Sequence, residues 1–581
     1  MGEKSHRWRV TVIILLMSAV WVGLGVRISS LHLGDHPRLQ TTIDRTREVA
    51  IPLLVGRGRI LDRNGSVLAA DISTRDVAVD PKFMNEHGFP RFTAQQLSRL
   101  LELDPAMVFA RIENPKSKYE LLKRRVPDDV SQQIQRMKMP GVRCDEVMAR
   151  VYPHANLMCH VVGFANMEGV GSAGIEQRND RYLRGVPGFR ETEVDGHRRE
   201  VRSRRKLEIV PQQGGDVYLT LDQNLQYFVE RALDAAIASN GAKGAWAIVQ
   251  RVRTGEILAM ASRPDFDLNE FNRVSPDDRL NRAIGYVFEP GSVFKIMVYA
   301  AALNEGLLRP DEIIDCENGY WVHGGKGLRD FHPYGRLSAT DALKKSSNIA
   351  AAKVALRLGE DRLYRYLQAF GVGRATGVEL PGEESGILHP RQKWSKLSIT
   401  RIPMGHEVAV TGLQMLNALN AVANGGALMR PHVVQRIATE RGQTIRQSEP
   451  EVLGHPIRPE AARTLTEMLV HVTQEGTGKR ARLDGYTVAG KTGTAEKPGP
   501  GGYDHKRNIA SFIGFLPAEQ PELSILVSFD EPQTLTQGGQ VAAPVFREIA
   551  EHAVRYLDIP QVDEARVIRL EVDPSDEEEL L

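Results

Sequence analysis

Residues 288–303 read FEPGSVFKIMVYAAAL, and the fold of the second half of the chain can be worked out from this stretch. Pro290-Gly291 interrupts the chain directly before an apolar run, 294–303, of the kind that forms a buried helix. Ser292 is therefore expected at the helix N-terminus, where unpaired N–H groups and the helix dipole stabilise negative charge. Lys295 lies about one turn further on, so the two side chains share a face.

Lys295 is the only charged residue in the apolar run 294–303. Burial disfavours an ammonium ion and lowers its pKa, so a neutral amine would be available to take the proton of Ser292. The same residues also fit a simpler interpretation, in which the serine caps the helix and the lysine reaches out to solvent. An S-x-x-K pattern is common by chance, so taken alone it favours the simpler interpretation.

A second motif, Ser346-Ser347-Asn348, falls between a short predicted helix over 338–345 and a longer helix. Taken alone, it is typical of a helix cap. In a catalytic interpretation, Ser346 would hold Lys295 and relay a proton to a leaving amine. The amide of Asn348 would bind Lys295 and a substrate carbonyl.

A third motif, Gly490-Lys491-Thr492-Gly493-Thr494, lies in a strand predicted over 485–495. Gly493 would leave room for another backbone to approach, so that an extended peptide could lie alongside the strand. Lys491 and the hydroxyls of Thr492 and Thr494 would hold a carboxylate. The N–H groups of Ser292 and Thr494 would form an oxyanion hole. The alternative is an ordinary strand turn with a solvated lysine.

Predicted strands lie at both ends of this half of the chain, with a long and mainly helical stretch between them. The strands are expected at 246–250, 256–262, 485–495, 508–516 and 523–529. The short separations within each group suit antiparallel hairpins. A helix over 544–557 would pack on the resulting sheet. The sequence therefore predicts an α+β domain with an antiparallel sheet and an all-helical subdomain.

The N-terminus contains a seventeen-residue uncharged run, VTVIILLMSAVWVGLGV, over 10–26. Its length is sufficient for a membrane-spanning helix, and the basic residues before it favour a cytoplasmic N-terminus. A cleaved signal peptide is the main alternative, but no small-residue cleavage site follows the run. The sequence thus predicts a cytoplasmic tail over 1–9, an anchor over 10–26 and an exported remainder.

Composition excludes several classes of protein. Lys and Arg number 75 against 73 Asp and Glu, for a net charge of +2. This balance disfavours a nucleic-acid-binding protein and an acidic disordered chain. The three cysteines, Cys144, Cys159 and Cys316, have neither zinc-ligand spacing nor the density of a disulfide framework, although one pair could bridge in an oxidising compartment.

The exported part changes character near residue 211. Residues 45–210 contain short strand-like pieces, with helical spacing only at 94–112 and 118–137. Long apolar helices alternate with strands over 211–557. The remaining residues, 558–581, end in the acidic stretch DPSDEEELL and are expected to form a tail.

In this order, SVFK, SSN and KTGT resemble the S-x-x-K, S-D-N and K-T-G set of serine β-lactamases and penicillin-binding proteins. Ser347 stands where the usual second motif has Asp, a common variation. Six longer stretches resemble class B penicillin-binding proteins. They are RGRILDRNGSVLA (57–69), RVYPHANLMCHVVGF (150–164), GSAGIEQRNDRYLRG (171–185), TGEILAMASRPDFDLNEF (254–271), EGTGKRARLDGYTVAGKTGTAEK (475–497) and GGQVAAPVF (538–546).

This resemblance implies a peptidoglycan D,D-transpeptidase anchored in the bacterial inner membrane by one helix, with its catalytic domain outside. A non-catalytic pedestal domain over 45–210 would precede a penicillin-binding domain of the serine β-lactamase-like fold over 211–557. Overall length favours the septal, cell-division type, with an elongation-type enzyme as the alternative. Leu535-Thr536-Gln537 departs from the aromatic residues that many septal enzymes carry there, which leaves the substrate-side wall and β-lactam selectivity undetermined.

The resemblance also implies a mechanism. Ser292 attacks the penultimate D-Ala carbonyl of a stem peptide, and an amine of a neighbouring stem peptide then attacks the acyl-enzyme. No metal or organic cofactor is required. The implied partners are stem peptides, β-lactams, a polytopic membrane glycosyltransferase and division proteins, and not nucleic acid. The implied catalytic residues are Ser292, Lys295, Ser346 and Asn348, and the implied substrate-binding residues are Lys491, Thr492, Gly493 and Thr494.

Three other classes remain for comparison. A β-lactamase needs a base that activates water, and the sequence does not identify one. A β-lactam sensor needs a signalling domain, for which the predicted cytoplasmic piece is too short. A catalytically inactive scaffold is disfavoured by the presence of Ser292, Lys295 and Lys491. The lifetime of a penicillin adduct, together with cross-linking activity, separates these classes.

Overall fold

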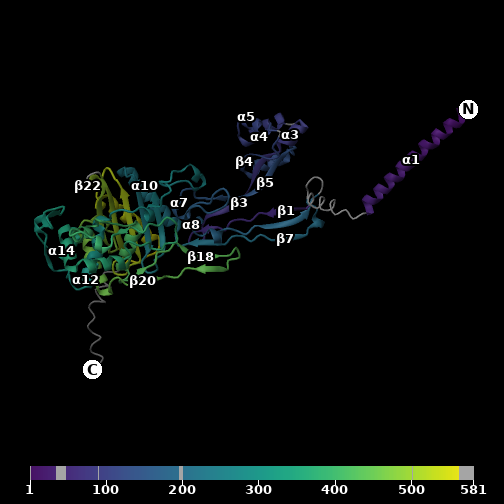
Figure 1. Ribbon diagram of the computed structural model, residues 1–581. Coiled ribbons are helices and arrows are strands. Elements are labelled where there is room, and N and C mark those ends of the chain that lie inside the picture. Colours follow the sequence, from purple (N-terminus) through teal and green to yellow (C-terminus); the bar gives the residue numbers. More distant parts are fainter. Residues whose placement is uncertain are drawn as a thin grey trace, which may run out of the picture. The chain divides into compact units, whose positions relative to one another are not determined.

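The computed structural model describes residues 2–33, 48–88, 90–114, 116–194, 200–499 and 502–561 (Figure 1). The chain divides into two units, one formed by 1–55 with 186–212 and the other by 56–185 with 213–581. Most of the predicted tail, from residue 562 onward, lies outside the described residues. All three cysteines lie within them and are free thiols.

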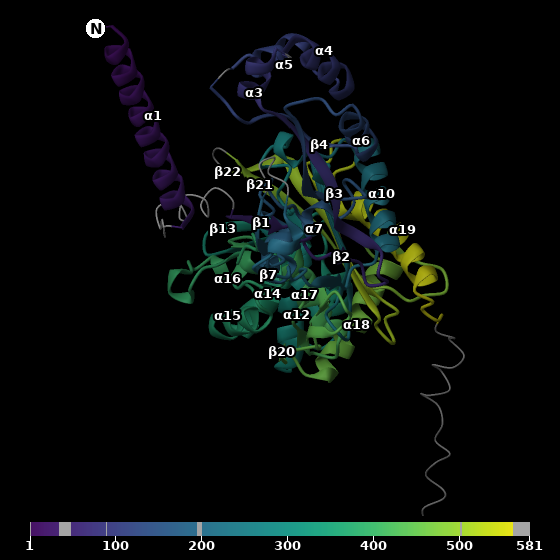
Figure 2. The same cartoon turned by 90° about the vertical axis from the view of Figure 1, so that its right-hand side faces the viewer.

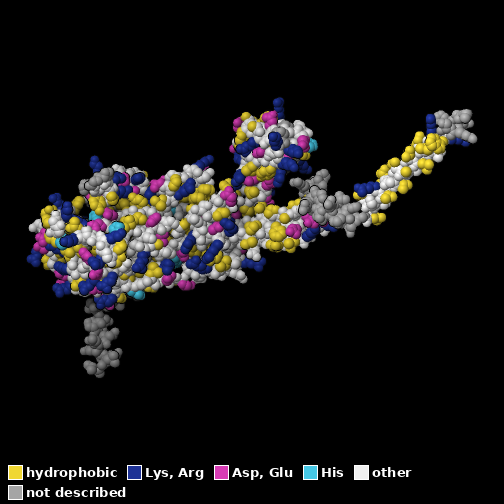
Figure 3. All heavy atoms as spheres, viewed as in Figure 1, with side chains coloured by type: hydrophobic (Ala, Val, Ile, Leu, Met, Phe, Trp, Pro, Cys, Tyr) yellow, Lys and Arg dark blue, Asp and Glu magenta, His cyan; other side chains and the backbone are white. Residues whose placement is uncertain are grey.

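The first unit contains helix α1 (Gly2–Leu33) and a small antiparallel sheet in the order β1-β6-β7. Its strands are β1 (Glu48–Leu53), β6 (Gly188–Glu193) and β7 (Leu207–Ile209). Within α1, Arg7–Leu33 is long and apolar enough to cross a membrane. Its side chains are exposed, and hydrophobic groups cover most of the helix (Figure 3). The predicted anchor is therefore the middle of a helix that extends beyond it at both ends.

The second unit is built around a five-stranded antiparallel sheet in the order β10-β9-β23-β22-β21. Its strands are β9 (Gly244–Arg251), β10 (Ile257–Arg263), β21 (Ala489–Gly499), β22 (Gly502–Leu516) and β23 (Leu523–Asp530). Pairing of β9 with β23 joins the two groups of strands. The predicted α+β sheet is confirmed, although β21 begins four residues later than expected.

Helices α10 (Gln223–Asn240) and α19 (Gly538–Tyr556) lie side by side on one face of this sheet (Figure 2). Helix α19 starts six residues before the predicted residue 544 and contains Pro544 in its interior. Gly538, the first residue of the helix, lies close to the sheet. A Cβ at Gly538 would lie 2.2 Å from the carbonyl oxygen of Ser511 and 2.3 Å from that of Gly493, so only glycine fits there.

The opposite face of the sheet packs on the subdomain that lies between the strand groups. Its main helices are α12 (Lys295–Asn304), α13 (Ala339–Lys344), α14 (Asn348–Leu358), α15 (Glu360–Ala369), α17 (Gly412–Ala423) and α18 (Pro459–Gln474). The prediction of an all-helical subdomain is wrong in detail. β12 (Tyr320–His323) and β13 (Lys326–Arg329) form a hairpin through Gly324 and Gly325, whose positive φ angles suit a tight turn. β11 (Ile313–Asp315) also pairs with β14 (Arg336–Ser338).

A second sheet of this unit combines strands that precede the five-stranded sheet in sequence with two strands from the stretch between its strand groups. Its strand order is β19-β18-β8-β2-β3-β4, and β5 also pairs with β3. The strands are β2 (Ile60–Leu61), β3 (Val67–Val79), β4 (Glu120–Val126), β5 (Val142–Val151), β8 (Asp216–Leu219), β18 (Val434–Ala438) and β19 (Thr444–Gln447). The far end of β3 packs with a small helical lobe made of α3 (Pro81–His87), α4 (Pro90–Leu101), α5 (Pro105–Ile112) and α6 (Asp128–Arg136).

Two helical predictions in this lobe need correction. The predicted segment 94–112 is two helices, because Pro105 starts α5 and the Asp104 side chain caps it by accepting from the N–H of Ala106. In the predicted segment 118–137 only α6 is helical. Residues Glu120–Val126 instead pair with β3, and this tertiary pairing outweighs their local helical spacing.

A buried ion-pair network joins three of the stretches that resemble penicillin-binding proteins. The carboxylate of Glu176 is fully buried and accepts from Nε of Arg57 and Nε of Arg150, each at 2.6 Å. Arg57 also contacts Asp180 at 2.6 Å, and Arg150 contacts Asp71 at 3.1 Å. Segments 57–69, 150–164 and 171–185 thus meet at one charged cluster.

Replacing Glu176 by alanine is expected to destabilise the fold by about 3–5 kcal/mol, because two buried guanidinium groups would lose their shared counter-ion. Denaturant unfolding of the full-length protein in detergent measures the change. Glu451→Ala is the matched control, since Glu451 forms a 2.6 Å pair with Arg430 at the exposed surface. The control should lower stability far less, because an ion pair exposed to solvent contributes little. Equal losses in the two variants would show that the buried network has no special role.

Candidate active site

Ser292 lies in a single helical turn, η3 (Gly291–Phe294), that leads directly into α12. The turn packs against β21. Gly291 has φ +62°, and a Cβ there would lie 3.1 Å from both the carbonyl oxygen of Thr494 and the Cβ of Ala495. Glycine at this position therefore lets the turn lie on the strand, with Ser292 half-buried beside it.

Lys295 is fully buried and connects the first motif to the second. Its Nζ donates to the carbonyl oxygen of Ser346 at 2.6 Å, to Oδ1 of Asn348 at 2.8 Å and to Oγ of Ser346 at 3.2 Å. Burial lowers the pKa of Lys295 to about 7, although the nearby carboxylate of Asp330 acts in the opposite direction. A neutral amine is therefore accessible near neutral pH.

Lys491 connects the third motif to Ser346 of the second motif. It is also fully buried, and its Nζ donates to Oγ of Ser346 at 2.9 Å and to the carbonyl oxygen of Thr492 at 3.1 Å. Burial and the charge of Lys295 hold the pKa of Lys491 well below its ordinary value. The Ser346 hydroxyl thus lies between two lysine amines, on a residue with φ +61°. Such a left-handed conformation is unusual outside glycine and is enriched at functional sites.

The other members of the third motif have different environments. Thr492 is buried, and its hydroxyl lies 2.8 Å from that of Thr477. Thr494 is exposed, and its Oγ1 accepts from the N–H of Gly538 at 3.1 Å.

The sequence did not indicate which segment of the chain packs against Gly493. A Cβ there would lie 2.9 Å from Cγ1 of Val293 and 3.2 Å from the carbonyl oxygen of Pro290. The space that was expected to admit another peptide backbone is instead filled by the turn that carries Ser292.

A cluster of polar residues lies beside the Ser292 turn. The sequence patterns did not indicate this cluster. Glu289 accepts from the Tyr503 hydroxyl at 2.8 Å and from the N–H of Glu407 at 3.0 Å, and it lies 3.1 Å from Nδ1 of His406. Burial acts to raise the pKa of Glu289, but the hydrogen bonds from His406 and Tyr503 outweigh it and lower that pKa. These residues have no short-motif spacing, so only the tertiary structure reveals the cluster.

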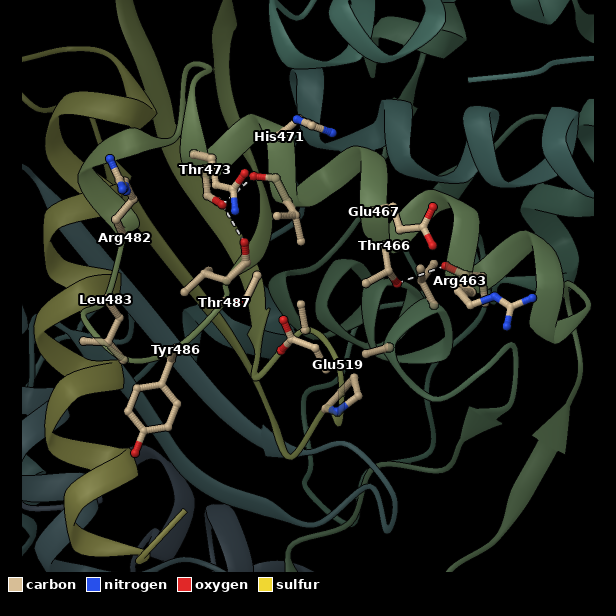
Figure 4. Close-up of a pocket in the computed structure, with 18 of the residues that line it drawn as sticks. Arg463, Thr466, Glu467, His471, Thr473, Arg482, Leu483, Tyr486, Thr487 and Glu519 are labelled. Carbon is tan, nitrogen blue, oxygen red and sulfur yellow. Dashed lines mark hydrogen bonds between the residues drawn. The ribbon is translucent and has the colours of Figure 1, made fainter. Parts of the chain in front are cut away.

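A cavity of about 1030 Å³ lies elsewhere in the same unit, between α18, the segment before β21 and the turn after β22 (Figure 4). Arg463, Glu467, His471, Arg482 and Glu519 are among its lining residues. The residues of the three motifs do not belong to its described lining. This cavity is therefore separate from the three motifs.

Comparisons with known proteins show the family to which this chain belongs. The family described as penicillin binding protein transpeptidase domain matches residues 245–551, which include all three motifs. The family described as penicillin-binding protein dimerisation domain matches residues 52–219. The chain belongs to the class B penicillin-binding proteins. It is an enzyme of the peptidoglycan D,D-transpeptidase type.

Relatives of this class B penicillin-binding protein extend over most of its length. It is 33% identical to the peptidoglycan D,D-transpeptidase FtsI of Escherichia coli K12, over 87% of this chain and 84% of the relative. It is 31% identical to stage V sporulation protein D of Bacillus subtilis, over 96% of this chain and 87% of the relative. The ampicillin complex of penicillin binding protein 3 from Mycobacterium tuberculosis superposes with a TM-score of 0.69 at 27% identity, covering 91% of this chain and 98% of that structure.

Proposed function

We propose that Ser292 is the residue acylated by the substrate and that Lys295 is its base. The Lys295 amine supports this proposal most strongly. It is buried, its pKa is lowered to about 7, and it donates hydrogen bonds to Ser346 and Asn348. Ser292 lies on the helical turn that immediately precedes this lysine. Near neutral pH the amine can accept the serine proton, which makes the serine oxygen a competent nucleophile.

In the proposed reaction, the oxygen of Ser292 bonds to the penultimate D-Ala carbonyl carbon of a stem peptide. The N–H groups of Ser292 and Thr494 stabilise the oxyanion. Ser346, which bonds to both lysine amines, passes a proton to the departing D-Ala nitrogen. An amine of a second stem peptide then attacks the acyl carbon, releases Ser292 and forms the cross-link.

Lys491, Thr492 and Thr494 are proposed to hold the terminal carboxylate of the stem peptide. A carboxylate beside Lys491 would favour its ammonium form and would offset the effect of burial on its pKa. Gly493 contributes indirectly, because the absence of a side chain lets the Ser292 turn rest on the strand that carries these groups.

The lifetime of a penicillin adduct distinguishes this transpeptidase from a hydrolase. Full-length protein in detergent is incubated with a penicillin, freed from excess drug, digested and analysed by mass spectrometry at successive times. The adduct is expected on the peptide that contains Ser292 and should persist after the drug is removed. Rapid loss with recovery of active enzyme would support a β-lactamase instead.

We also propose that residues 1–9 are cytoplasmic, that residues 10–26 cross the inner membrane, and that the catalytic domain lies outside. The basic residues Lys4, Arg7 and Arg9 support this orientation. Within the exported part, we propose a pedestal over 45–210, a transpeptidase domain over 211–557 and a tail over 558–581. Chemical labelling of single cysteines introduced at Ser5 and at exposed Ser385 tests the orientation. Labelling of Ser5→Cys from outside intact cells would contradict it.

Septal wall synthesis is the proposed cellular role, supported by the similarity to FtsI over most of both chains. An elongation-type enzyme is the alternative. A fluorescent fusion in growing cells should concentrate at mid-cell. Dispersed labelling along the wall would favour the alternative.

We further propose that the enzyme cross-links glycan strands made by a separate polymerase, a polytopic membrane glycosyltransferase. The region before the transpeptidase domain matches a dimerisation domain. Purified full-length protein given lipid-linked disaccharide pentapeptide alone should therefore produce no glycan polymer. Addition of a polymerase should yield cross-linked polymer. Glycan polymer formed without an added polymerase would contradict the proposal that a separate enzyme makes the glycan strands.

A further inference from the structure

Asp330 is not part of the second motif in sequence, but its side chain binds two residues of that motif. The residue directly follows β13, and its carboxylate is half-buried against the start of α14. The hydroxyl of Ser347 donates to Oδ2 of Asp330 at 2.6 Å. The N–H groups of Asn348 and Ile349 donate to Oδ1, the latter at 3.0 Å. One carboxylate thus receives three hydrogen bonds from consecutive residues.

These contacts complete the N-terminus of α14. The first N–H groups of a helix have no partner within it and need acceptors from elsewhere. Oγ of Ser347 accepts from the N–H of Ala350 at 3.0 Å, and Asp330 accepts from the two N–H groups before it. A carboxylate is also favourable at this end of the helix dipole. The usual second motif has Asp at the position of Ser347. In this chain the carboxylate comes from Asp330, which lies seventeen residues away.

The capped residues are neighbours of those that hold the Lys295 amine. Ser346 and Asn348 flank Ser347 and both accept from Nζ of Lys295. Nδ2 of Asn348 also donates to the carbonyl oxygen of Arg329 at 3.0 Å. Residues 329–330 therefore hold Asn348 through its backbone N–H and through its side chain, and this orients Oδ1 toward the lysine.

We propose that Asp330 is a positioning residue of the acylation step, whose carboxylate fixes the second motif against Lys295 and adds negative charge near that amine. The inference rests on the proposed role of Lys295 as the base. Asp330 itself touches neither Ser292 nor the bound peptide in this scheme. It acts through Ser347 and Asn348.

The charges around Lys295 give this role a measurable signature. Burial lowers the pKa of Lys295, and the charge of Asp330 acts in the opposite direction without overcoming it. The other titratable groups of this region include Lys491 on β21, Tyr299 on α12, Cys316 just after β11, and Tyr334. Burial raises the pKa of Tyr299, of Cys316 and of Tyr334, so all three are neutral near pH 7. Asp330 is therefore the anion that favours the protonated form of Lys295.

The test measures the second-order rate constant of β-lactam acylation by full-length protein as a function of pH. Asp330→Asn keeps the size of the side chain and an oxygen acceptor for the helix cap but removes the charge. The pKa of Lys295 should then fall, and the acid limb of the profile should move to lower pH. Asp330→Ala also removes the cap, so acylation should be slower at every pH by about 10- to 100-fold.

Asp315→Asn is the matched control, because Asp315 is an exposed carboxylate in the same subdomain whose Oδ1 accepts from the N–H of Glu317. Its profile should equal that of the unmodified protein. An acid limb that stays in place or moves to higher pH in Asp330→Asn would overturn the inference. If Asp330→Ala does not fold, the Asp330→Asn profile decides. Retained acylation of Ser292→Ala would instead refute the proposed function itself.

Discussion

Replacing Ser292 by alanine is expected to abolish covalent labelling by β-lactams, with the rate of adduct formation reduced by more than about 1,000-fold. Alanine has no oxygen to attack the lactam carbonyl, so no ester can form. The packing of the turn should survive, because Gly291 and Val293 make its close contacts with β21. Intact-mass spectrometry after exposure to excess penicillin measures the occupied fraction.

The control for this experiment is Ser385→Ala, which removes an exposed hydroxyl from the same unit. This variant should acylate at the normal rate and to one adduct per chain. An undiminished adduct in Ser292→Ala, or an adduct that maps to a different peptide, would refute the assignment of the nucleophile. Equal melting temperatures of the two variants would exclude unfolding as the cause of a lost adduct.

Arginine substitutions should separate the two buried lysines. Lys295→Arg is expected to lower the acylation rate by more than about 1,000-fold, because a guanidinium group stays protonated and cannot take the serine proton. It is also too large for a site in which the amine contacts both Ser346 and Asn348. Lys491→Arg should retain measurable acylation, since a cation that binds a carboxylate is still present, but about 10 to 100 times more β-lactam should be required.

Titration of each variant with penicillin over fixed times gives the rate constants for this comparison. Lys479→Arg, at an exposed position in the same unit, should behave as the unmodified protein does. Complete and equal loss in Lys295→Arg and Lys491→Arg would contradict the proposed division of roles. The contact of Lys491 with Ser346 would then indicate that both amines act on the same proton.

Local sequence patterns were sufficient to predict much of the secondary structure of the catalytic domain. Alternating apolar residues and short turns predicted the five strands of the central sheet, and the structure confirms that they form one antiparallel sheet. The break at Pro290-Gly291 and the apolar run after it predicted the Ser292 turn and the helix behind it. These signals depend on residues that are close in sequence, which is why they can be recognised without the fold.

The secondary-structure predictions were wrong where contacts with residues far away in the sequence determine the local structure. Glu120–Val126 has helical spacing but forms a strand, because the edge of β3 satisfies its backbone hydrogen bonds. Helix α19 starts six residues earlier than predicted, at Gly538, which fits closely against the backbone of Ser511 and Gly493. Neither partner can be inferred from the spacing of the residues in the segment itself.

The sequence by itself determined the type of fold, the apolar N-terminal helix and the residues proposed to carry the chemistry, because periodicity and short motifs are properties of local sequence. Only the tertiary structure decided how the site is assembled. It brings the amines of Lys295 and Lys491 to the hydroxyl of Ser346, and it places Asp330 on the start of α14. Burial then lowers the pKa of both lysines, which depends on the packing of many distant side chains and on no local pattern.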